Sequence, residues 1–158
     1  MKKAFTCLLL LIVPYFASAQ QSTHQNHPFA VELSIVTASL HKELFSRNGG
    51  FLVDAKITNI SGEDQTITQW SQPGWSWLSD NPVISPDISA LQNFPSTLVL
   101  KSSEVYRTRV WLYFYPRSQG PVSFRLGFFP RAKFPVSGRP NEVPRDQVSW
   151  SNAVTLTQ

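Results

Sequence analysis

Residues 105–115 read Val-Tyr-Arg-Thr-Arg-Val-Trp-Leu-Tyr-Phe-Tyr, and this stretch decides the fold class. Its side chains alternate with a period of two, as they do in a strand that is buried on one face only. We assign to the buried face Tyr106, Thr108, Val110, Leu112 and Phe114. Burying two unpaired arginines would be prohibitive, so the solvent-facing set is Arg107, Arg109, Trp111 and Tyr113. The stretch therefore predicts a half-buried β-strand whose outer side carries arginines beside aromatic rings.

The rest of the chain repeats this pattern in short segments. Further strands are expected at 29–36, 51–58, 65–70, 98–101, 122–129 and 148–157, with a shorter one near 83–84. Turn-forming clusters separate them, and a single helical turn is expected at 88–94. Residues 39–47 are expected to form either an irregular edge or one helical turn. About seven short strands of this kind predict an all-β protein, an immunoglobulin-like antiparallel β-sandwich that occupies residues 29–158 as one domain.

The first nineteen residues have the three parts of a secretory signal peptide. Lys2 and Lys3 form the positive start, an apolar run covers 4–16, and Ala17-Ser18-Ala19 is an A-x-A cleavage site. The run is shorter than the roughly 20 residues that a transmembrane helix needs. We expect cleavage after residue 19, a flexible polar leader at 20–28, no membrane span in the mature chain, and a periplasmic or secreted location.

Removal of this segment changes two properties of the chain. The formal net charge falls from +4 to +2 with the loss of Lys2 and Lys3. The single cysteine, Cys7, is also lost, so the mature 139 residues have no disulfide, no thiol nucleophile and no cysteine metal ligand. A domain of this size buries about two-thirds of its unfolded surface, so we expect it to fold on its core alone.

Two sequence motifs carry a resemblance to a known family. One expected strand ends in Ile57-Thr58-Asn59-x-Ser61, and residues 150–157 read Trp-Ser-Asn-Ala-Val-Thr-Leu-Thr. Together with a hydrophobic strand after a turn, they resemble bacterial secreted immunoglobulin-like accessory domains over most of the mature chain. Size and strand order are also similar to the proteinase-inhibitor Ig-like family. The resemblance implies the sandwich fold and carries over no binding residues.

No catalytic motif in the sequence is complete. Gly74-Trp75-Ser76-Trp77-Leu78 lacks the last glycine of a nucleophile elbow and has no strand-to-helix context. The scattered oxygen donors Asp80, Asn81 and Asp87 are too few for calcium, which takes about six to eight ligands. His24 and His27, in the polar leader, are imidazoles of the kind that bind copper or zinc. We expect no catalytic residues, no metal site and no cofactor, with copper or zinc handling by these histidines as an alternative.

Two tryptophans lie in a proline-rich stretch at 71–97. An extended backbone there would place Trp75 and Trp77 on one side. The rings would then either cap the end of the sandwich or form a stacking platform for a sugar or peptide. Trp70 and Trp150 fall on expected strands and are assigned to the core.

Basic residues accumulate in the second half of the chain. Between Val105 and Asn141 there is no acid, and the seven basic residues are Arg107, Arg109, Arg117, Arg125, Arg131, Lys133 and Arg139. Such a field attracts an anionic glycan or an acidic protein face. Alternatively, the strand arginines pair across the sheet with Glu32, Asp54 or Glu104.

These features favour an exported, non-catalytic binding or interaction module. The expected partner is an envelope or secreted protein, and the alternative is an anionic glycan or surface polysaccharide; nucleic acid is not expected. Proline-stiffened loops at 71–97 and 130–146 are expected contact surfaces, since they lose less entropy on binding. The candidate ligand-binding residues are Trp75, Trp77, Arg107, Arg109, Trp111 and Tyr113.

Overall fold

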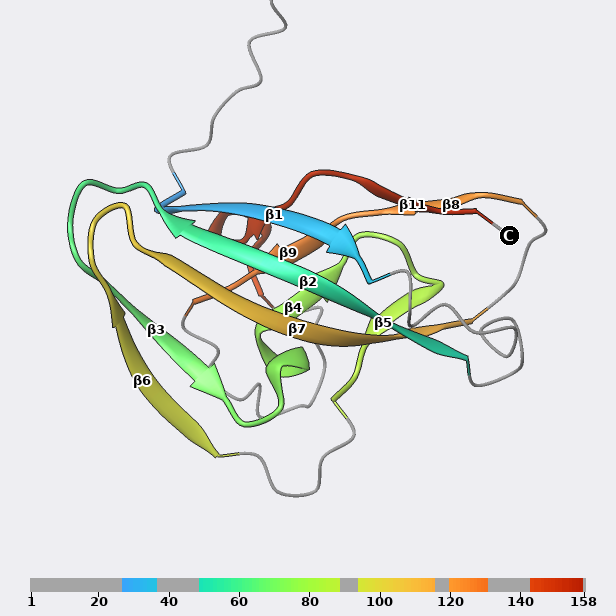
Figure 1. Ribbon diagram of the computed structural model, residues 1–158, viewed down its shortest axis with the longest axis horizontal. Coiled ribbons are helices and arrows are strands. Elements are labelled where there is room, and N and C mark those ends of the chain that lie inside the picture. The colour runs from blue at the N-terminus through green and yellow to red at the C-terminus, as the bar shows by residue number, and fades with distance from the viewer. Residues whose placement is uncertain (1–26, 37–48, 89–93, 116–119, 131–142, 158) are drawn as a thin grey trace, which may run out of the picture.

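A computed structural model describes residues 27–36, 49–88, 94–115, 120–130 and 143–157 (Figure 1). Within these ranges the protein is all-β, with short 3₁₀ turns as its only helices. The strands are β1 (Phe29–Ile35), β2 (Gly50–Asn59), β3 (Gln65–Trp70), β4 (Trp77–Ser79), β5 (Ile84–Pro86), β6 (Pro95–Leu100), β7 (Val105–Phe114), β8 (Val122–Phe124), β9 (Leu126–Phe128), β10 (Ser149–Trp150) and β11 (Val154–Leu156). The predicted all-β class is confirmed, and its antiparallel sheets are consistent with a β-sandwich.

The largest sheet has the strand order β1-β2-β7-β5, and its neighbours are all antiparallel. β1, β2 and β7 run side by side across Figure 1. The alternation read from 105–115 holds, because Val110, Leu112 and Phe114 are buried whereas Arg107 and Arg109 are exposed. One face of this sheet therefore belongs to the core and the other to solvent.

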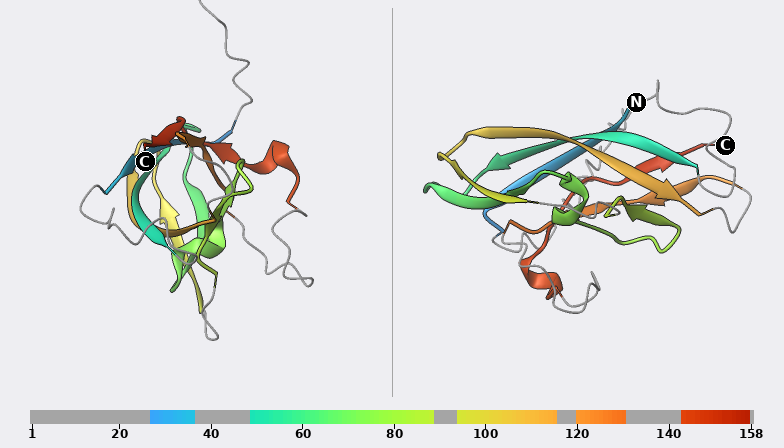
Figure 2. Two further views of the ribbon diagram at one scale, coloured as in Figure 1. Left: turned by 90° about the vertical axis from the view of Figure 1, so that its right-hand side faces the viewer. Right: turned by 90° about the horizontal axis from the view of Figure 1, so that it is seen from below.

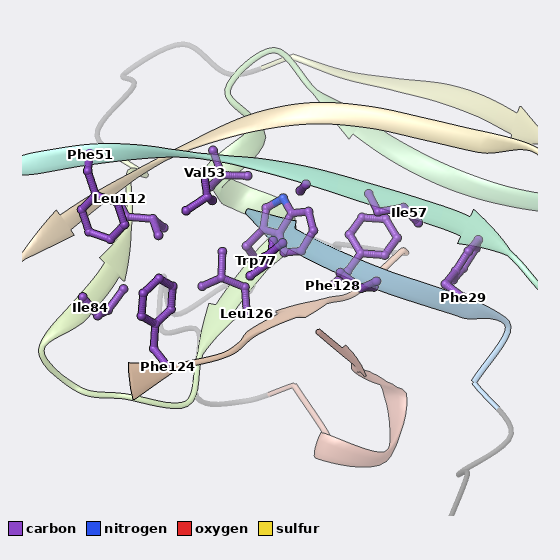
Figure 3. Close-up of a cluster of buried hydrophobic side chains, with 14 of the residues drawn as sticks. Phe29, Phe51, Val53, Ile57, Trp77, Ile84, Leu112, Phe124, Leu126 and Phe128 are labelled. Atoms are coloured by element: carbon purple, nitrogen blue, oxygen red, sulfur yellow. The ribbon is translucent and has the colours of Figure 1, made fainter. Parts of the chain in front are cut away.

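The opposite layer consists of the sheet β10-β9-β4 and the pair β11-β8. Its side chains Phe124, Leu126 and Phe128 point toward β2, as Figure 3 shows. The Phe124 ring meets Phe51 edge-on at 5.9 Å between centroids, and Phe128 meets Phe29 in the same way at 5.6 Å. Edge-to-face pairs are favourable beyond the area they bury. Aromatic interdigitation thus joins the two layers.

A long ribbon links the layers at one end of the molecule. β2 pairs with β7, and β3 pairs with β6. The chain bends between β2 and β3 and again between β6 and β7, so the second pair continues the first (Figure 1). Asn59 fixes the bend: its buried Nδ2 donates to the carbonyls of Glu63, Leu100 and Lys101 at 2.6, 2.9 and 3.1 Å. Buried polar groups need such partners, so this asparagine stabilises the corner.

The C-terminal segment covers the β1 edge of the main sheet. The left view of Figure 2 shows the red C-terminal strands beside blue β1. Val31 forms an isolated parallel bridge with Ser151, and the side chain of Asn152 bonds the backbone of Leu33. The prediction of one strand over 148–157 was wrong, because residues 151–153 leave the ladder to make these contacts. Asn152 is exposed, and Val148 and Ser149 are buried together, so the expected alternation does not hold there.

Other expected boundaries also shift. The single strand expected at 122–129 is divided at Arg125, whose N–H donates to Asp80 Oδ1 at 2.7 Å instead of a ladder carbonyl. The stretch 71–97 contains β4, which the sequence pattern did not indicate, as well as β5. The helical turn expected at 88–94 falls mostly outside the described residues, as do most of the leader and the loop at 130–146, and residues 39–47 lie outside them entirely.

Candidate functional site

The candidate site is the solvent-facing side of β1, β2 and β7, here called the outer face. Its strand register aligns charged side chains in two rows across the sheet. One row is Glu32, Lys56 and Arg107, and the other is Ser34, Asp54 and Arg109. Side chains directly opposite one another on a sheet lie close enough to interact, so each row is a continuous polar strip.

Two ion pairs neutralise most of these charges. Lys56 Nζ lies 2.7 Å from Glu32 Oε1, and Arg109 Nε lies 2.8 Å from Asp54 Oδ1. The cross-strand pairing considered for the arginines is therefore present for Arg109. The acid Glu104 acts differently, because its Oε2 accepts the Lys101 N–H at 2.8 Å.

Arg107 is the surplus cation of the outer face. No carboxylate pairs with it among the residues that the structure describes. It stands opposite Lys56, which is already bound to Glu32. Five charged residues of the face, three basic and two acidic, leave a net charge of +1 that Arg107 carries.

Trp111 lies at the end of the outer face next to Arg109. Leu52 is opposite it on β2, and its indole ring covers Gly50, where a β-carbon would collide with the ring. Because Gly50 has no side chain, the indole can pack directly against the strand backbone. Trp111 remains 37% exposed, and the neighbouring Tyr113 is half-buried. The sheet holds an aromatic surface beside the arginines, as the alternation predicted.

A shallow hollow of about 720 Å³ covers part of this surface. Its lining is Glu32, Leu33, Ser34, Asp54, Ala55, Lys56, Arg107, Thr108 and Arg109. Small-molecule pockets are mostly apolar with a few polar groups, whereas charged side chains form the walls here. The hollow suits a polar or charged surface that lies across the strands.

The loop tryptophans do not join this face. Trp75 lies within a 3₁₀ turn at Pro73–Ser76, and Trp77 begins β4, so the prediction that an extended backbone places both on one side was wrong. Trp77 is 3% exposed and packs on Phe128, with 5.2 Å between ring centroids. Trp75 is half-buried against Trp70 at 5.6 Å. Trp77 belongs to the main core cluster and offers no exposed ring for stacking, whereas Trp75 packs against a second cluster.

Trp70 and Trp150 were assigned to the core. Trp70 is 7% exposed and belongs to a second apolar cluster with Phe129 and Val148. Trp150 is half-buried against the same cluster.

The basic run between 105 and 141 does not form one surface in the described part of the chain. Arg125 belongs to the opposite layer, between β8 and β9, where its Nε binds Asp80 at 2.8 Å. Its guanidinium also lies 5.5 Å from the centre of the Trp150 ring. Arg117, Arg131, Lys133 and Arg139 lie outside the described residues. Of the basic run, the described residues that lie on the outer face are therefore Arg107 and Arg109.

The residues that the sequence suggested for catalysis or metal binding have structural roles. Ser76 of the incomplete nucleophile elbow is buried, and its hydroxyl lies 3.5 Å from the carbonyl of Thr68. Asp80, weighed for calcium, binds Arg125. The described residues hold no group of three or more His, Cys, Asp or Glu that could bind a metal, and His24 lies outside them.

The sequence offered Glu32 and Asp54 as alternative partners of the arginines, but it did not indicate the pair between Lys56 and Glu32 or the role of Gly50. Which outward residues meet depends on strand register, which alternation along single strands does not give.

No protein-family model and no curated protein matches this chain. In the described ranges, none of the helices has the length and apolar character required to span a bilayer.

Proposed function

We propose that this protein is an exported, non-catalytic binding module that contacts a protein of the cell envelope through the outer face. The observation that carries the proposal is Arg107, which meets no carboxylate among the described residues although the other charges of this face are paired. The exposed ring of Trp111 lies farther along the same strand, beyond Arg109. The immunoglobulin-like topology belongs to the same proposal. Antiparallel pairing in two layers and the sequence motifs at 57–61 and 150–157 support it.

The residue types of the face suit protein recognition. Tryptophan, tyrosine and arginine are enriched among residues that dominate binding energy at protein interfaces. Paired strands already hold them in place, so association orders few side chains. Trp111 in particular is fixed by its contact with Gly50.

The pattern of charges favours a protein over a uniformly anionic polymer. Glu32 and Asp54 stand in the same hollow as Arg107 and Arg109. A polymer with an acid on every unit would meet these carboxylates as well, and like charges brought together at an interface reduce affinity. A protein surface can place one carboxylate against Arg107 and donors against the acids. An anionic glycan stays the second candidate, because Arg107 supplies a cation and Trp111, farther along the same strand, supplies a stacking surface.

Affinity capture from the native envelope tests the proposal. The bait is the purified protein, with Arg107→Glu and Trp111→Ala as face variants and Arg145→Glu as the control. Arg145 is an exposed arginine on the 3₁₀ turn Arg145–Gln147, away from the outer face. We expect one protein partner to be retained by the wild type and the control and to be lost by both face variants. Equal capture by all four proteins would contradict the proposal.

A binding titration with an acidic polysaccharide separates the two ligand classes. Saturable binding that Arg107→Glu abolishes, together with no face-dependent protein in the capture experiment, would favour the glycan. Binding that 0.5 M salt removes and that no face variant changes would be non-specific.

A further inference from the structure

Among the residues that the structure describes, no strand pairs with the outer edge of β6. β6 has one neighbour, β3, in its two-stranded sheet, and it lies on the outer side of that ribbon in Figure 1. Unpaired strand edges present N–H and C=O groups that can pair with another chain. Proteins commonly protect them with charged side chains, and the segment 94–100, Phe-Pro-Ser-Thr-Leu-Val-Leu, has none.

The alternation of hydrogen-bonded residues along the β3–β6 pair shows which backbone groups of β6 face outward. The Ser71 N–H donates to the Phe94 carbonyl at 3.2 Å, at the start of the β3–β6 register. In an antiparallel pair every second residue exchanges hydrogen bonds with its partner, so Ser96, Leu98 and Leu100 bond β3. Thr97 and Val99 direct their backbone groups away from it.

At each end of this segment, the outward backbone N–H group is either absent or already bonded. Pro95 has no N–H to offer. At the other end, the Lys101 N–H is taken by Glu104 Oε2 at 2.8 Å. In the described part of the chain, the residues with both an N–H and a C=O directed outward are therefore Thr97 and Val99, and Val99 is 53% exposed.

We propose that a second copy of this chain covers the edge, with the two β6 strands antiparallel about a two-fold axis. Thr97 would pair with the partner's Val99 and Val99 with the partner's Thr97, which satisfies all four groups of each copy. Leu98 would lie opposite the partner's Leu98. Two features favour a second copy: the open segment is self-complementary under a two-fold rotation, and no charge on either strand opposes the approach.

The proposal is independent of the partner proposed for the outer face. The surface involved is short, so the association is weak, with dissociation constants up to about 1 mM. No residue of β6 belongs to the outer face, and both contacts can therefore exist in one molecule.

Disulfide trapping tests the register. In the full chain with Cys7→Ser, a single Leu98→Cys would face itself across the axis, in a non-hydrogen-bonded pair with Cα atoms about 4.5 Å apart. Oxidised glutathione should convert it to a covalent dimer. The matched control is Val99→Cys, which is more exposed but would face Thr97 of the partner, so it should cross-link several-fold more slowly. Equal or faster trapping of the control would overturn the proposed register.

Sedimentation velocity over a concentration series tests the edge itself. Val99→Pro removes an outward N–H while sparing the β3 ladder, whereas Val99→Thr keeps it. We expect dimer in the wild type and Val99→Thr at high concentration, and monomer in Val99→Pro with an unchanged circular dichroism spectrum. A wild type that stays monomeric to about 1 mM, or a Val99→Pro protein that still dimerises, would overturn the proposal. If Val99→Pro does not fold, the cross-linking comparison decides.

Discussion

The side-chain amide of Asn152 forms two hydrogen bonds with the backbone of Leu33, accepting from its N–H at 2.8 Å and donating to its carbonyl at 3.2 Å. The amide thus takes the place of a peptide group in a neighbouring strand. It covers the edge of β1, where the chain between β10 and β11 is irregular. The main sheet and the opposite layer are joined by a side chain at this point.

Replacing this amide should lower stability. Asn152→Asp removes the donor and places a carboxylate oxygen against the Leu33 carbonyl, so we expect a loss of about 1–3 kcal/mol in the free energy of unfolding. Urea denaturation followed by tryptophan fluorescence measures it. Thr157→Ala, an exposed change nearby, is the control and should alter stability by less than about 0.5 kcal/mol. Equal midpoints for the two variants would show that the contact is dispensable.

The corner at Asn59 should be more sensitive. Its side chain is fully buried and satisfies three carbonyls, while its Oδ1 accepts from the N–H and hydroxyl of Ser61. Asn59→Ala would remove all five of these side-chain hydrogen bonds at a fully buried position, so we expect a loss of at least about 2 kcal/mol. Ser61→Ala, at an exposed position, should lose less than half as much in the same urea titration. The reverse order would contradict this account of the bend.

Gly127 should not accept a side chain. A β-carbon there would overlap Val148 Cγ1 and press on the Trp150 ring. We expect Gly127→Ala to destabilise the protein by about 1–3 kcal/mol, as overpacking does. The cost should shrink in a Val148→Ala background, because the colliding methyl group is gone, and a double-mutant cycle measures this coupling. Additive effects would rule out the collision as the cause.

The two exposed arginine pairs should differ in strength. Arg109 makes one contact with Asp54, and both side chains are at least half exposed. Arg125 binds Asp80 through Nε and its own N–H and stacks near Trp150. We expect Arg109→Ala to change stability by less than about 0.5 kcal/mol and Arg125→Ala to cost about 1 kcal/mol. Thermal unfolding compares the two, and an equal shift would remove the distinction.

The leader gives a direct chemical test. If residues 1–19 are a signal peptide, the exported chain begins at Gln20, and intact-mass spectrometry should find the mass of residues 20–158. Ala19→Leu should slow this processing, since the cleavage site requires a small residue. Ala30→Leu lies on β1, well past the site, and should leave the cleavage position unchanged. An exported chain that keeps residues 1–19 would contradict the prediction.

Period-two alternation was enough to predict most strands and the outward direction of Arg107, Arg109, Trp111 and Tyr113. This works because the chemistry of a half-buried strand is local: each side chain points to one face or the other. It failed where tertiary partners replaced ladder partners, as Asp80 does at Arg125 and Asn152 does at Leu33. It also failed at Trp75 and Trp77, because Trp75 lies within a 3₁₀ turn that ends just before Trp77, and such a turn is not visible as alternation.

The sequence by itself determined that the chain is all-β and which side of β7 faces water. Only the tertiary structure decided that Arg109 meets Asp54 while Arg107 meets no carboxylate in the described part of the chain, and that Trp77 is core. Burial preference acts on each residue separately, and alternation records it. Pairing and free edges depend on register between segments that are distant along the chain, and many registers are compatible with one alternating pattern.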